Sequence, residues 1–232
     1  MDNGLSGYQP PHGPVWPPPP AGVPPPVYLY PAVFRPLTDL ARLNVVMIVV
    51  FTIMVCISNI VDTITSGLPS TVVTLLTLPL SLFGLIVHML WIYRAYGNLS
   101  ALDSVNRKSS PGWAVAYFFI PFLALYKPYQ IVMEMFERSD PDPSIRVTPL
   151  PAQVVKLWWV MYLASIGTGW FESASTSGKS GPSTYGPAAI DVVVNVIWAW
   201  FAYQVIIQLT ARMHARHEAL MANGRDQTQY YA

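Results

Sequence analysis

The sequence predicts an all-α membrane protein with four transmembrane helices, a proline-broken re-entrant or interfacial helix and a disordered, proline-rich N-terminal tail. Three observations lead to this fold class. The chain is 53% hydrophobic and only 11% charged, whereas a soluble domain carries about 25% charged residues. Its apolar residues fall into runs of the roughly 20-residue length that crosses a membrane. About half of the 23 prolines lie within residues 1–36.

The composition also limits the classes of function. A net charge of +1 offers no broad basic surface for nucleic acid. Cys56 is the one cysteine, which excludes an internal disulfide and a cysteine-cluster metal site. The sequence contains no HExxH, GxSxG or phosphate-binding loop and no paired carboxylates within a span. We therefore expect no cofactor, no metal and no enzymatic activity.

Residues 1–36 form the predicted cytoplasmic tail. Its runs of proline have few apolar side chains to bury, so we expect disorder with polyproline II character. The tail contains one PPxY sequence, from Pro25 to Tyr28. It is a candidate ligand for a cytosolic proline-recognising partner. The alternative is a solvated tail without a partner, because PxxP spacings are nearly unavoidable at this proline content.

The predicted membrane domain covers residues 37–215, and its spans lie at about 40–62, 71–96, 153–172 and 187–210. Residues 216–232 form a second cytoplasmic tail. In the first span, Asn44 and Asn59 share a helix face with Ile48 and Phe51 between them. This pattern predicts a packing face with polar ends and not a polar pore lining.

The second span carries a seam of mostly small or polar residues at alternating spacings of three and four. Such a seam favours close helix packing and interhelical hydrogen bonds, and a hydrated path or ligand groove is the alternative. The seam consists of Thr74, Thr77, Ser81, Gly84, His88, Trp91, Ala95 and Asn98. A further small-xxx-small pair lies in the third span at Ser165 and Gly169. Seams of this kind also predict contact between copies of the chain in a homo-oligomer.

His88 is the single histidine expected within the hydrocarbon region. We predict that it forms a hydrogen bond between packed helices. Haem held between transmembrane helices takes two axial ligands. The other histidines lie in the tail or beyond the last span, and they are His12, His214 and His217. We therefore do not expect haem held by two histidines of one chain.

The segment 112–138 starts like a span and then stops. Trp113 to Tyr126 is apolar or aromatic over roughly 14 residues, or about 21 Å of helix, against a hydrocarbon core of about 30 Å. Pro121 and Pro128 interrupt it, and an amphipathic stretch with Glu134 follows. We expect a broken helix that enters the bilayer and returns, followed by a helix at the interface.

The basic residues decide the predicted topology. With four spans and a cytoplasmic N-terminus, all 13 lysines and arginines except Lys179 fall on the cytoplasmic side, as the positive-inside rule requires. A fifth crossing would place Arg138, Arg146 and Lys156 outside and remove this bias. We expect a plasma-membrane protein in contact with the lipid bilayer, with both termini cytoplasmic.

Several short blocks resemble a known family. They are WIYRAYGN from Trp91 to Asn98, SPGWAV from Ser110 to Val115, FIP ending at Pro121, and KPYQ from Lys127, followed by Glu134. Together they resemble the bacterial family called domain of unknown function 4328, over roughly residues 38–215. The resemblance implies a small multi-span membrane protein, often with a proline-rich cytoplasmic tail, and it implies no activity.

The candidate functional or structural residues come from these blocks and from the seam. They are His88, Trp91, Arg94, Asn98, Pro111, Gly112, Trp113, Pro121, Pro128 and Glu134. One hypothesis is that Arg94 pairs with Glu134, and the alternative is that Arg94 extends to lipid headgroups. The predicted function is a membrane interaction or scaffold component with a recruiting tail. The alternative is a small oligomeric channel or transporter that uses the re-entrant segment as a gate or filter.

Overall fold

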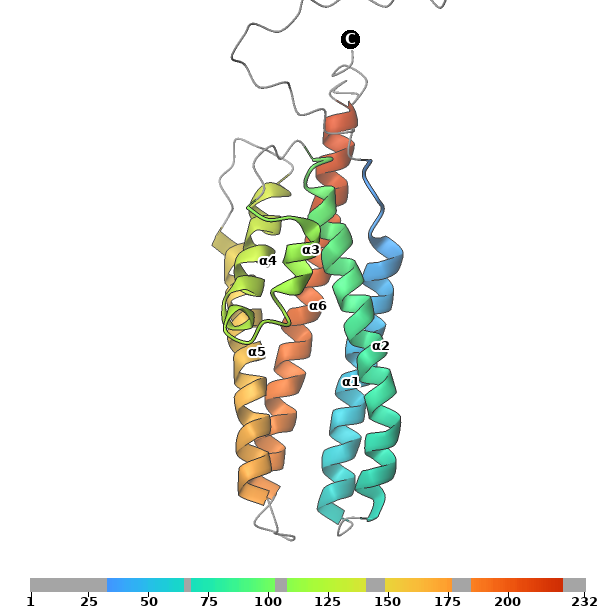
Figure 1. Ribbon diagram of the computed structural model, residues 1–232, viewed down its shortest axis with the longest axis vertical. Coiled ribbons are helices and arrows are strands. Elements are labelled where there is room, and N and C mark those ends of the chain that lie inside the picture. Colours follow the sequence, from blue (N-terminus) through green and yellow to red (C-terminus); the bar gives the residue numbers. More distant parts are fainter. Residues whose placement is uncertain (1–32, 65–67, 103–107, 141–148, 177–184, 223–232) are drawn as a thin grey trace, which may run out of the picture. The chain divides into compact units, whose positions relative to one another are not determined.

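The computed structural model describes residues 33–64, 68–102, 108–140, 149–176 and 185–222. Within these ranges the chain is helical and contains no strand, which confirms the all-α class. The predicted conformations of residues 1–32 and 223–232 lie outside the described residues. Figure 1 shows the helices, whose bounds are α1 Thr38–Ile64, α2 Leu68–Asn98, α3 Pro111–Ala116, η1 Leu123–Leu125, α4 Lys127–Arg138, α5 Pro149–Thr176 and α6 Tyr185–Ala222.

The long helices extend past the apolar runs that predicted them. The largest extension is in α6, which continues to Ala222 and so includes the start of the predicted C-terminal tail. Hydropathy locates only the apolar part of a helix. The helix itself continues beyond that part where its side chains still make contacts with the rest of the protein. In α6 these partners exist, because Met213 is buried and Arg216 donates to the carbonyl of Leu102.

Three helices of the described region are long and apolar enough to cross a membrane. Their candidate spans are Thr38–Asn59, Thr77–Asn98 and Gly186–Ala222, in α1, α2 and α6. The predicted span in α5 is not among them, although α5 is 28 residues long. Its tryptophan, tyrosine, glycine, serine and threonine residues lower its mean hydropathy, so length and composition alone do not select it.

The helices follow the order α2, α1, α6, α5 in space. Helix α1 lies between α2 and α6, and α5 packs along α6. Between α2 and α5, the segment from α3 to α4 fills the space at the end of the bundle where α2 finishes (Figure 1). Most of the buried core gathers at this end, which we call the Asn98 end. Its largest fully buried side chains include Trp91, Tyr96 and Phe136, and Leu209 and Met213 of α6 are also fully buried.

Residues 108–140, which we call the hairpin, confirm the predicted break. Helix α3 ends at Ala116, and the next α-helix, α4, begins at Lys127. Both ends of the hairpin lie at the Asn98 end, because the amide of Ser109 donates to the Tyr96 hydroxyl and Asp140 pairs with Arg212 of α6. The turn between them carries outward apolar side chains, with Phe122 84% exposed. Whether this turn lies within a membrane stays a prediction.

Candidate functional site

Glu134 is the centre of a buried polar cluster that joins the hairpin to α2. Its side chain is only 2% exposed, and three donors reach its carboxylate. The Tyr96 hydroxyl donates to Oε2 at 2.9 Å, the amide of Lys108 donates to Oε1 at 3.0 Å, and Arg138 Nε lies 2.9 Å from Oε1. A buried carboxylate is tolerated when it is paired and hydrogen-bonded in this way. The cluster therefore fastens both arms of the hairpin to one tyrosine of α2.

Arg94 does not take part in this cluster. Its Nη1 donates to the carbonyl of Pro36 at 3.3 Å, at the entrance to α1. The hypothesised Arg94–Glu134 pair is therefore wrong, and Arg138, one helical turn after Glu134, takes the position of the cation. The reason is geometric, because Tyr96 of α2 faces the hairpin whereas Arg94 faces the segment before α1.

Residues 33–37, which we call the strap, are held against the Asn98 end by several contacts. Asn98 is 2% exposed and uses both ends of its amide, accepting from the Arg35 amide at 2.9 Å and donating to the Arg35 carbonyl at 2.8 Å. His214 of α6 accepts from the amide of Leu37 at 3.3 Å. Phe34 stacks on His217 with ring centroids 4.3 Å apart. The chain is thus held in place just before it enters α1.

The SPGW sequence starts a helix. The Ser110 hydroxyl accepts from the amide of Trp113 at 3.3 Å, and Pro111 occupies the first turn, where its missing donor costs nothing. A methyl group at Gly112 would meet no atom closer than 4.0 Å, so close packing does not demand a glycine there. Trp113 is 54% exposed and is not part of the core.

The remaining predicted residues fall into structural positions. Trp91 is buried, and its indole donates to Thr210 of α6 at 3.4 Å. Pro128 is buried in the first turn of α4, whereas Pro121 is exposed in the turn of the hairpin. Pro128 therefore helps to begin α4, whereas Pro121 lies in the turn that follows the end of α3.

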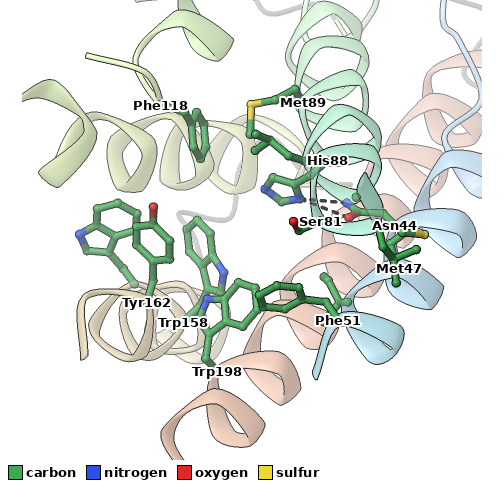
Figure 2. Close-up of a pocket in the computed structure, with 15 residues that line it drawn as sticks. Asn44, Met47, Phe51, Ser81, His88, Met89, Phe118, Trp158, Tyr162 and Trp198 are labelled. Carbon is green, nitrogen blue, oxygen red and sulfur yellow. Dashed lines mark hydrogen bonds between the residues drawn. The ribbon is translucent and has the colours of Figure 1, made fainter. Parts of the chain in front are cut away.

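His88 lies elsewhere, in a cavity of about 280 Å³ within the bundle. Its Nδ1 is 3.1 Å from the Asn44 amide nitrogen and 3.3 Å from the amide oxygen, which confirms the predicted interhelical hydrogen bond. Figure 2 shows the ring directed into the cavity, with Phe118 of the hairpin above it. Ser81 and Gly84 of the same seam also line the cavity, as do Trp158, Trp159, Tyr162 and Trp198 on the opposite side.

Several of these residues were not selected from the sequence. Trp158, Trp159, Tyr162 and Trp198 are not among the candidate residues that the sequence predicted, although all four line the cavity. Asp191 is buried and accepts a hydrogen bond from Thr168 at 2.8 Å, and neither feature was predicted. Its spacing on α6 gives no indication of a partner on α5. No cluster of three or more metal-ligating side chains occurs in the part of the chain that the structure describes.

These features define a helical protein with membrane-like helices, whose hairpin is fastened to the bundle by a buried carboxylate. The model of a family described as Domain of unknown function (DUF4328) matches residues 59–213. The chain belongs to this family, as its short blocks indicated. No curated protein and no solved structure matches it.

Proposed function

We propose that the protein is a four-span plasma-membrane scaffold that presents its proline-rich tail to cytosolic partners. The observation that carries the proposal is the strap. The tail joins the membrane domain at residues 33–37, where Asn98 binds both backbone groups of Arg35. The start of the tail is fixed to the membrane domain in this way, and tethering a bound partner there raises its effective concentration at the membrane.

Charge supports a cytoplasmic position for the Asn98 end. Most basic residues of the described region lie on the strap, the two ends of the hairpin and the adjoining helix ends, and positively charged flanks stay in the cytoplasm. They are Arg35, Arg42, Arg94, Lys108, Arg138, Lys156, Arg212 and Arg216. Lys127 is different, because it begins α4 next to the turn of the hairpin.

Helix α5 is the proposed fourth span. At 28 residues it is about 42 Å long, which exceeds the roughly 30 Å of a hydrocarbon core. It carries a line of outward apolar side chains that includes Val160 and Ile166, and Trp170 is 77% exposed near its far end, as expected at a membrane interface. With α5 as a span, the hairpin becomes a re-entrant element that enters from the cytoplasmic face.

An oligomeric channel is the second candidate. The hairpin favours it, because irregular backbone at membrane depth is tolerated where it is covered by protein or lines a water-filled path. The cavity beside the hairpin argues against a conduit within one chain, since its lining is mostly aromatic and aliphatic. Ion flux in liposomes tests this candidate directly, and a flux that persists after deletion of residues 1–32 would favour it over the scaffold.

Topology is tested first, by cysteine accessibility. Cys56 is replaced by alanine, and single cysteines at Ser144, Ser177 and Phe122 are probed with an impermeant maleimide in intact and opened cells. We expect Ser144 to react only after opening, Ser177 to react in intact cells and Phe122 to stay unlabelled. Labelling of Ser144 from outside would mean that the hairpin segment crosses the membrane, and would overturn the four-span proposal.

Recruitment is tested by in-cell cross-linking of the full chain and of variants in the tail. Deletion of residues 1–32 and Tyr28→Ala should each remove the same cytosolic protein, and the tail fused to an unrelated single-span anchor should recover it. The purified partner should then bind the reconstituted chain. Equal recovery of partners with and without the tail would refute the scaffold.

A further inference from the structure

The cavity that contains His88 opens toward the side of the bundle. Its walls come from α1, α2, α5 and α6, and Phe118 of the hairpin closes it at the Asn98 end. Within the described ranges α2 and α5 share no extended interface below the hairpin, so the side between them is not sealed by helix packing. This lateral cavity therefore faces the hydrocarbon of the bilayer once α2 and α5 are spans, and a ligand can reach it without passing through water.

The size and lining of the lateral cavity suit a planar apolar group. Its volume of about 280 Å³ is close to the lower limit of roughly 300 Å³ for ligand pockets. Trp159 lies against Trp158 and Tyr162, with ring centroids 5.5 Å and 4.9 Å apart. Flat aromatic walls favour offset stacking of another ring. None of the residues that line the cavity in the described region is acidic, lysine or arginine, which favours a neutral ligand.

His88 supplies a hydrogen-bond donor to the cavity. Nδ1 lies 3.1 Å from the Asn44 amide nitrogen and 3.3 Å from the amide oxygen, so the donor of this hydrogen bond depends on the tautomer of the ring. In the tautomer with its proton on Nε2, the Asn44 amide donates to Nδ1. The ring is only partly buried, because it faces the cavity (Figure 2). Its Nε2–H is then available to an acceptor in the cavity.

Trp198 supplies a second donor in the cavity wall. Its Nε1 is buried and has no hydrogen-bond partner within the described structure. A buried donor without an acceptor costs about 1–3 kcal/mol. A ligand oxygen that the indole could turn to meet would remove this cost, so the site favours ligands with acceptors over pure hydrocarbons.

We propose that the lateral cavity binds a planar, neutral, lipid-soluble molecule that carries carbonyl oxygens, taken up from the bilayer. The ring stacks among the tryptophans, one carbonyl oxygen accepts from His88 Nε2, and the other accepts from Trp198 Nε1 after the indole has turned toward the cavity. This binding is independent of the tail and so goes beyond the scaffold.

The test compares two probes of nearly equal shape, 2-methyl-1,4-naphthoquinone and 2-methylnaphthalene, which lacks both carbonyls. Binding to the full chain in lipid nanodiscs is measured by equilibrium dialysis, with protein-free nanodiscs subtracted for partition into lipid. We expect saturable binding of the quinone, about tenfold tighter than that of the hydrocarbon, which corresponds to about 1.4 kcal/mol.

Two variants and one control locate the site. Trp198→Phe keeps the ring and removes the donor, so it should weaken the quinone severalfold and leave the hydrocarbon unchanged. Trp200→Phe is the matched control, because Trp200 is on the same helix, 59% exposed and outside the cavity. Ser81→Leu should fill the cavity and abolish binding of both probes.

Three results would overturn the proposal. They are equal affinity for the two probes, equal effects of Trp198→Phe and Trp200→Phe, and unchanged quinone binding in a Ser81→Leu protein that elutes and melts like wild type. If Ser81→Leu fails to fold, the Trp198→Phe comparison decides alone.

Discussion

The cluster around Glu134 makes a quantitative prediction. Glu134→Gln removes the negative charge that pairs with Arg138 and accepts from the Tyr96 hydroxyl. It also replaces one carboxylate oxygen by an amide NH₂ group, which then lies against hydrogen-bond donors. Breaking a buried ion pair costs about 3–5 kcal/mol, and Arg138 retains 24% exposure, so water compensates in part. We expect a loss of about 3 kcal/mol, which at about 2–4 °C per kcal/mol lowers Tm by about 6–12 °C.

The matched control and the double-mutant cycles identify the partner. Glu137→Gln changes an exposed carboxylate on the same helix and should shift stability by less than about 0.5 kcal/mol. Glu134→Gln with Arg138→Gln should be less destabilising than the sum of the two changes by about 1–2 kcal/mol, whereas Glu134→Gln with Arg94→Gln should be additive. Tm in detergent is read by loss of the monodisperse peak after heating. Coupling to Arg94, or a Tm for Glu134→Gln within about 2 °C of the Glu137→Gln control, would refute the assignment.

Two further predictions concern the strap and the turn of the hairpin. Asn98→Ala removes both hydrogen bonds to Arg35, so the rates of proteolysis and hydrogen exchange at residues 33–37 should rise. Ser100→Ala is a nearby control. Unchanged protection of residues 33–37 in Asn98→Ala would show that the strap does not depend on Asn98. Phe122→Asp places a charge at the exposed turn and, if the turn enters lipid, should lower the amount of folded protein in membranes. The control is Glu137→Lys, which changes an exposed residue outside the turn and should leave this amount unchanged. Equal yields of the two variants would exclude burial of the turn in lipid.

The helices and the break in the hairpin could be predicted because they depend on local properties. Apolar runs of sufficient length, and prolines that lack a donor, act within a few residues of their own position. The prediction was weakest in α5, where aromatic and small residues dilute hydropathy in the sequence, although several of them, such as Trp158, Trp159 and Thr168, face the cavity or α6 in the structure. Hydropathy cannot distinguish a helix face whose polar residues contact water from one whose aromatic and small residues pack against other parts of the protein.

The partners in the polar clusters could not be predicted, with one exception. Asn98 and Arg35 are 63 residues apart, and Arg212 and Asp140 are 72 apart, so only the fold brings them together. The exception is Arg138, which follows Glu134 by four residues on the same helix and therefore was recognisable as its partner. The hypothesis selected Arg94 because it considered a cation on a different helix and did not consider the cation four residues after Glu134 on the same helix.

The Asn44–His88 pair allows stability and ligand binding to be separated. Asn44 is 1% exposed, so His88→Leu leaves a buried amide without its partner, and Asn44→Leu leaves His88 Nδ1 unpaired. Each single change should cost about 1–3 kcal/mol, whereas replacing both groups by apolar ones can be nearly neutral. The double variant should therefore melt close to wild type but show a smaller preference for the quinone over the hydrocarbon, because the donor at Nε2 is gone and only the Trp198 donor remains. A double variant as unstable as the sum of the two changes would show that these side chains do not act as a pair. A stable double variant whose preference for the quinone is as large as that of the wild type would show that His88 does not contact the ligand.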